Sequence, residues 1–150
     1  MAYKSKFSLI NQSISVRCPK CGLQINEHIR SPQSTYNLNC RSCKTVFLAY
    51  VAFIRAKRSR GDRRLAKREF DVRVIAFDES EHHLQFSNDA YDDFELRQSD
   101  IAAFIYVTNE LVAIQNVTIG CIYNIQKKDY TWVIYVIIIF VGFLALRSCI

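Results

Sequence analysis

Short apolar runs, separated by turn-forming residues, occupy most of the chain up to about residue 125. Runs with turn signals every eight to twelve residues or so are typical of strands in a small barrel or sandwich. They predict strands at 70–77, 83–87, 101–107, 111–116 and 117–125. We therefore expect a mainly β fold, with a small β-barrel over residues 69–126.

The run TVFLAYVAFI at 45–54 is apolar at odd and even positions alike. A strand with one face in water alternates between apolar and polar residues, whereas a strand buried on both faces does not. We therefore expect both faces of this strand to be covered, either by the second domain or by another subunit.

The longest apolar run lies near the C-terminus, where residues 132–146 carry no charge. As a helix, residues 130–150 would extend roughly 30 Å, about the thickness of the hydrocarbon layer of a bilayer. Tyr130, Trp132 and Tyr135 suit an interfacial aromatic belt. The run predicts one transmembrane α-helix and a short tail over 130–150. The alternative is a buried element of a soluble core.

Almost all basic residues precede this predicted span, and Lys127 and Lys128 are the nearest to it. The positive-inside rule then places the N-terminal domains in the cytoplasm. Residues 1–16 lack the continuous apolar core of a signal peptide. These features predict a single-pass, tail-anchored membrane protein.

Charge is distributed unevenly along the chain. Residues 1–68 contain fifteen Lys and Arg and two acidic residues, whereas residues 69–130 contain four basic and twelve acidic residues. The run RAKRSRGDRRLAKR predicts a polybasic linker at 55–68, which must face a negative partner or repel itself. Anionic lipid, nucleic acid and the chain's own acidic barrel are the three partners considered. The candidate lipid- or nucleic-acid-binding residues are Arg55, Lys57, Arg58, Arg60, Arg63, Arg64, Lys67 and Arg68.

Four cysteines form two C-x2-C pairs separated by eighteen residues: Cys18, Cys21, Cys40 and Cys43. This spacing is typical of a tetrahedral zinc site with four thiolate ligands. Two disulfides are the alternative, which a reducing cytoplasm disfavours. His28 lies between two complete pairs, and we interpret it as a solvated loop residue.

With these cysteines, residues 14–54 resemble a zinc ribbon. The resemblance implies two metal-binding knuckles, a structural Zn²⁺ and a small antiparallel sheet, with strands at 14–17, 35–39 and 45–54. Together with its N-terminal extension, this domain covers residues 1–54. Gly22 suits a tight knuckle, whereas Lys44 stands where glycine would be easier. Because four thiolates leave no open coordination position, we do not expect a catalytic metal.

The predicted barrel resembles OB-like and SH3-like barrels in strand number and length. Gly120 inside its last strand suggests a bulge or sharp bend, and we expect Cys121 to be an apolar strand residue. An excess of acidic residues disfavours this barrel as a groove for a phosphate backbone.

Nothing in the sequence indicates catalysis. The acidic residues of the barrel lie in turn-like stretches and are typical of a solvated surface. His82 and His83 are adjacent, so in a strand they would point to opposite faces, which disfavours a shared metal site or a His–acid dyad. No P-loop, G-x-S-x-G or H-E-x-x-H motif is present. We expect a non-enzymatic protein without a small-molecule substrate.

Two hypotheses follow. In the first, the ribbon and barrel form a cytoplasmic head that docks a protein partner or self-associates, while the basic run contacts anionic lipid near the membrane. In the second, the chain is a membrane-localised nucleic-acid-binding protein that uses the ribbon and the basic run. The first predicts binding that depends on lipid charge, and the second predicts nucleic-acid affinity that falls steeply with salt.

Overall fold

A computed structural model describes residues 13–28, 33–125 and 127 of the chain. Every regular element in this part is a β-strand, which confirms the mainly β prediction. The strands are β1 (Ser13–Arg17), β2 (Gln24–His28), β3 (Thr35–Asn39), β4 (Val46–Asp62), β5 (Lys67–Ile75), β6 (Glu81–Asn88), β7 (Ile101–Val107), β8 (Glu110–Asn116) and β9 (Cys121–Asn124).

The predicted transmembrane segment at 130–150 lies outside the described residues. Among the residues that are described, none belongs to a helix long and apolar enough to cross a membrane.

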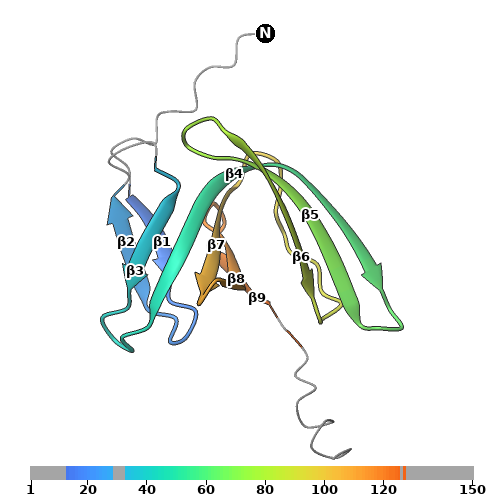
Figure 1. The fold of residues 1–150 in the computed structure, drawn as a ribbon, viewed down its shortest axis with the longest axis horizontal. Helices are drawn as coiled ribbons and strands as arrows, with labels where there is room; N and C mark the ends of the chain where they lie inside the picture. The colour runs from blue at the N-terminus through green and yellow to red at the C-terminus, as the bar shows by residue number, and fades with distance from the viewer. Residues whose placement is uncertain (1–12, 29–32, 126, 128–150) are drawn as a thin grey trace, which may run out of the picture.

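Strand β4 is the centre of the architecture. It pairs with β3 through its first half and with β5 through its second half, while β7 pairs with it over residues 48–53. The resulting antiparallel sheet has the order β6-β5-β4-β7-β8-β9, and β1 and β2 form a separate two-stranded sheet. The register of β4 on β5 shifts between Ile54 and Ala56, and such a bulge bends a strand and increases its twist. Figure 1 shows β4 arching across the molecule, with β1–β3 near its first half and the β4–β5 hairpin on the other side.

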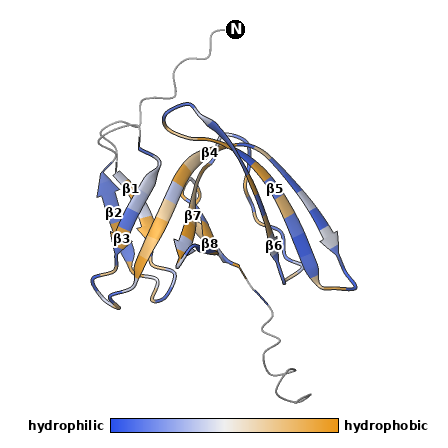
Figure 2. Cartoon of the chain, in the orientation of Figure 1, coloured by the Kyte–Doolittle hydropathy of each residue, from blue (hydrophilic) through white to orange (hydrophobic). Residues whose placement is uncertain are grey.

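The basic run differs from the expected linker. Residues 55–62 continue β4, and residues 67 and 68 begin β5, so only residues 63–66 form a turn. The sequence did not predict this part of β4, because Lys57 and Ser59 occupy inner-face positions that are normally apolar. Figure 2 shows this change along β4, from a hydrophobic first half to a hydrophilic hairpin tip.

The first half of β4 is buried on one face and partly buried on the other. On one face Phe47, Ala49 and Val51 pack in a cluster with Ile14 and Val16 of β1. On the other face, the inside of the curved sheet, the buried cluster combines residues of β4, β5 and β7 with β8 and the 89–100 loop: Ala52, Ile54, Phe70, Val72, Val74, Phe94, Leu96, Ala102, Phe104 and Ile114. Cover from other parts of the same chain therefore explains most of the apolar run at 45–54, whereas Val46 remains 63% exposed.

A buried glutamine joins the two sheets. Gln115 of β8 is 3% exposed, and its Oε1 accepts a hydrogen bond from the backbone N–H of Arg17 at 2.8 Å. Its Nε2 donates to the carbonyl of Ser15 at 2.9 Å. Because both ends of this amide are satisfied by β1, the small sheet is fixed to the large one in a defined register.

The curved sheet remains open between β6 and β9, since the strand pairings found in the described part include none between these two edges. The loop over residues 89–100 fills the gap with Phe94, which is 3% exposed. The Phe94 ring stacks on Phe70 of β5 with centroids 4.4 Å apart, and it contacts Tyr123 of β9 at 5.2 Å. The Phe94 side chain thus connects β5 with β9 across the open side of the sheet, where the described strands form no pairing.

Three local expectations differ from the structure. Strand β2 was not predicted, because QINEH is largely exposed and carries only one apolar residue. Gly120 lies in the turn between β8 and β9 with φ of 75°, rather than within a strand, and its N–H donates to Asn116. Cys121 is exposed at the start of β9 instead of packing as an apolar strand residue.

Candidate metal centre

The four cysteines of the two C-x2-C pairs come together at one end of the ribbon. Their sulfur atoms all lie within 4.8 Å of one another. Sγ of Cys18 is 3.5 Å from that of Cys43, and Sγ of Cys21 is 3.4 Å from that of Cys40. Four sulfurs held about 2.3 Å from a central ion at tetrahedral angles would be roughly 3.8 Å apart, so this arrangement could hold a metal ion.

The two knuckles share one backbone geometry. In the first, the N–H of Gly22 donates to the carbonyl of Cys18, and the N–H of Cys18 donates to Leu23, both at 2.9 Å. In the second, the N–H of Lys44 donates to Cys40 and that of Cys40 to Thr45, also at 2.9 Å. The fifth residue of each knuckle has a left-handed backbone, with φ of 74° for Gly22 and 59° for Lys44. The sequence therefore correctly identified Lys44 as standing at a position that favours glycine.

This equivalence predicts opposite effects for two substitutions. Gly22→Ala should lower the free energy of unfolding by about 1 kcal/mol, because an L side chain is strained at this φ although the space around it is open. Lys44→Gly should be neutral or stabilising by up to about 1 kcal/mol, since it removes the same strain. Thermal unfolding of the metal-loaded chain measures both, and equal destabilisation by the two changes would contradict the shared geometry.

The sulfurs differ in their surroundings. Cys18 and Cys40 are buried, Cys43 is half-buried and Cys21 is exposed. Burial raises the pKa of the Cys18 thiol to about 11, whereas hydrogen bonds from the hydroxyl and N–H of Thr45 lower the pKa of Cys43 to about 6. The Thr45 Oγ1 atom lies 3.1 Å from the Cys43 sulfur. Thr45 is thus a supporting residue that the cysteine spacing alone did not reveal.

The basic candidates are spread over several surfaces. Lys57 and Arg68 turn toward Asp93 in the 89–100 loop, at 2.9 and 3.7 Å, and their side chains are only 17% and 15% exposed. Lys57 also donates to the carbonyl of Phe94. Burial raises the pKa of Asp93, but the hydrogen bond and charge of Lys57 outweigh it, so this pKa lies below its usual value. Lys57 and Arg68 therefore connect the 89–100 loop to the sheet through ion pairs.

Three further basic candidates also have partners at the surface. Arg55 forms an ion pair with Glu81, and Lys67 lies 3.6 Å from Glu69. The guanidinium of Arg63 lies 5.6 Å from the centre of the Tyr91 ring.

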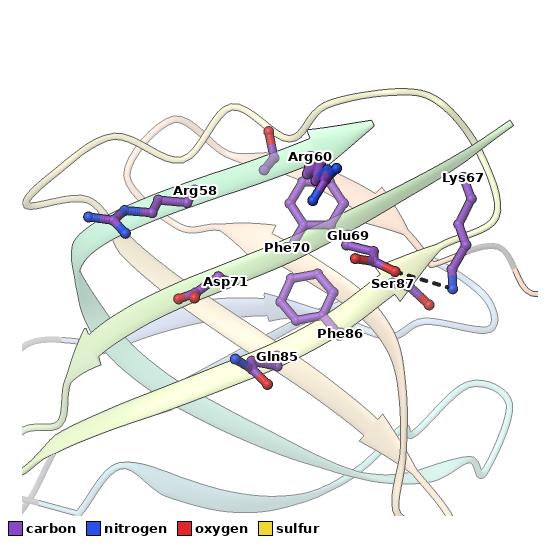
Figure 3. Close-up of a pocket in the computed structure, with 10 residues that line it drawn as sticks. Arg58, Arg60, Lys67, Glu69, Phe70, Asp71, Gln85, Phe86 and Ser87 are labelled. Carbon is purple, nitrogen blue, oxygen red and sulfur yellow. Dashed lines mark ion pairs between the residues drawn. The ribbon is translucent and has the colours of Figure 1, made fainter. Parts of the chain in front are cut away.

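Arg58, Arg60 and Arg64 form no ion pair with any other described residue. Arg58 and Arg60 lie on the outer face of the hairpin, opposite Asp71 and Glu69 in the strand register. Figure 3 shows Arg58 and Arg60 in an open recess whose lining also contains acidic, apolar and uncharged polar side chains. The outer face of the hairpin therefore carries side chains of both charges.

Two of the described histidines have polar partners at the exposed surface. The hydroxyl of Ser80 lies 2.8 Å from His82 Nε2 and 2.5 Å from a carboxylate oxygen of Asp78. The serine therefore lies between the histidine and the acid. His83 contacts Asp71 at the exposed surface, a His–acid pair that the sequence analysis disfavoured. His28 is exposed at the end of β2 and is not one of the clustered metal-ligating residues.

Comparison of the chain with models of protein families, with curated proteins and with solved structures finds no match.

Proposed function

We propose that this chain is a membrane-tethered, non-enzymatic interaction module with a zinc-stabilised β head. The observation that carries the proposal is the closed set of four cysteine sulfurs at the end of a ribbon that shares strand β4 with the larger sheet. Such a site supplies folding free energy rather than a reactive metal, because no coordination position is left for a substrate.

Zinc is the metal that best suits this centre. Thiolate ligands select soft or borderline ions, and a tetrahedral set of four thiolates is typical of structural Zn²⁺. The two C-x2-C pairs and the small sheets beside them support a zinc ribbon. The curved sheet of β4–β9, open on one side, supports an OB-like, partly open barrel.

The proposed tether is the uncharged run at 132–146, which follows the head after a few residues. A single-pass span there, with the head in the cytoplasm, agrees with the basic residues that precede it. The head would then dock a protein partner or a second copy beside the membrane. The alternative, a membrane-localised nucleic-acid-binding protein, draws support from the exposed arginines Arg58, Arg60 and Arg64, which have no ion pair within the described part.

Extraction and titration of the full chain test these proposals together. We expect the chain to stay with membranes in alkaline carbonate and to dissolve only in detergent, whereas a chain ending at residue 129 should be released. Reconstituted in nanodiscs, the full chain should bind single- or double-stranded nucleic acid weakly at physiological salt. Release of the full chain by carbonate would contradict the tether. Tight nucleic-acid binding that falls steeply with salt would favour the alternative.

A further inference from the structure

The place where the chain leaves the head lies at the same edge of the sheet as the metal centre, three strands away from β4. The N–H of Ile125, just after β9, donates to the carbonyl of Val112 at 2.9 Å. The neighbouring Leu111 of β8 is paired with Tyr106 of β7, and Tyr106 is paired with Leu48 of β4. Strand β4 begins at Val46, directly after the second knuckle. The end of β9 and the knuckles therefore lie along the same edge of the head, the lower edge in Figure 1.

The chain between this edge and the apolar run is short. Six residues lie between Ile125 and Trp132, which makes seven steps along the chain, and an extended chain covers at most about 3.6 Å per step. If residues 130–150 cross a bilayer, this edge of the head therefore lies within about 25 Å of Trp132, where the apolar run begins. This step rests on the tether of the proposed function.

The knuckles carry the chemistry of an anionic surface contact. Lys20, Arg41 and Lys44 are all exposed, and none of them forms an ion pair with another residue of the described chain. Residues 17–23 and 40–46 contain no acidic side chain. These cations also lie near the thiolate cluster, whose net charge with Zn²⁺ is negative. Their exposure leaves them available to a second anionic partner.

Apolar side chains accompany these cations. Leu23 in the first knuckle is 41% exposed, and Val46 at the end of the second is 63% exposed. Exposed apolar residues beside Lys and Arg are typical of surfaces that lie in the interfacial region of an anionic bilayer. The basic run at 55–68 fits less well, because four of its eight cations form ion pairs with acidic residues of the chain.

We propose that the knuckle face, defined as residues 18–23 and 40–46, rests on anionic lipid headgroups while the rest of the head points away from the bilayer. The metal centre then has a second role, since it shapes the two loops that present the lipid-contacting side chains. A protein partner, by this arrangement, docks on a surface other than the knuckles.

Tryptophan reporters in the full, zinc-loaded chain test this orientation. In a Trp132→Phe background, Leu23→Trp places the reporter on the knuckle face. Ile119→Trp is the matched control, because Ile119 is 46% exposed and lies in the β8–β9 turn, at the other end of β8. In vesicles containing phosphatidylserine and brominated lipid, we expect Leu23→Trp fluorescence to fall about two-fold or more and Ile119→Trp fluorescence to change little. If Leu23→Trp reduces zinc content, Val46→Trp replaces it.

Charge variants separate this contact from general attraction. Changing Lys20, Arg41 and Lys44 to Gln should abolish the quenching. Changing Arg58, Arg60 and Arg73, an exposed residue of β5, to Gln should leave the quenching unchanged. Flotation of the same vesicles reports on the tether: a chain that fails to float overturns the proposed membrane anchor. A chain that floats with Leu23→Trp unquenched, or with both reporters quenched equally, overturns the orientation alone.

Discussion

Replacing Cys40 by serine is expected to abolish stoichiometric metal binding and to unfold strands β1–β3 beside the cysteine cluster. Cys40 is fully buried, and its sulfur lies 3.4 Å from that of Cys21. Structural zinc contributes about 10–16 kcal/mol of apparent binding free energy in zinc-finger peptides, and that energy is coupled to folding. The loss here should therefore amount to at least several kcal/mol. Metal content per chain and thermal unfolding with and without a chelator measure it.

The effect should extend beyond the two knuckles, because β4 pairs with β3 and packs against β1 while it also forms the centre of the large sheet. If β1–β3 separate, the face of β4 formed by Phe47, Ala49 and Val51 becomes exposed to water. The other core cluster lies on the opposite face of the same strand, so strands β5–β8 should retain more protection against amide hydrogen exchange than β1–β3. Uniform loss of protection would show instead that the head unfolds as one unit.

Cys121→Ser is the control for this experiment. Cys121 is exposed at the start of β9 and is not one of the clustered metal-ligating residues. Its substitution should leave metal content unchanged and the free energy of unfolding within about 0.5 kcal/mol. Full metal occupancy in Cys40→Ser would contradict the four-cysteine centre.

The metal centre could be predicted from sequence because its determinants are local. Each knuckle is a turn of a few residues, and the C-x2-C spacing directs two sulfurs of each turn to the same side. Strands β3 and β7 could also be delimited correctly, since 35–39 and 101–107 are bounded by clear turn residues. In these segments the local pattern and the tertiary fold agree.

The second half of β4 could not be predicted, because its determinants are distant in sequence. Lys57 occupies an inward position that is satisfied by Asp93 and by the carbonyl of Phe94. Gln115 likewise pairs with Arg17, a residue 98 positions away. Hydropathy patterns record whether a residue is apolar, whereas these polar groups are buried only because a remote partner is present. The same reasoning explains why a run with eight basic residues does not form one basic surface.

Phe94→Ala should be among the most destabilising single substitutions outside the cysteine cluster. Its ring is buried in a loop, stacks on Phe70 and contacts Tyr123 across the open side of the sheet. Removing a buried phenylalanine side chain costs about 3–5 kcal/mol, since apolar burial is lost and a cavity remains. We expect the midpoint of thermal unfolding to fall by about 10 °C or more.

The position of Phe94 makes this cost informative about how the two edges of the curved sheet are held together. No strand pairing links β6 to β9 in the described residues, so aromatic contacts supply the connection. Phe94→Leu should recover part of the lost stability, because its side chain fills part of the cavity. Leu65→Ala is the control and should change the free energy of unfolding by less than about 0.5 kcal/mol, because Leu65 is 63% exposed. If Phe94→Ala cost no more than Leu65→Ala, the loop would be an external cover, and the two edges of the sheet would have to be held together by other contacts.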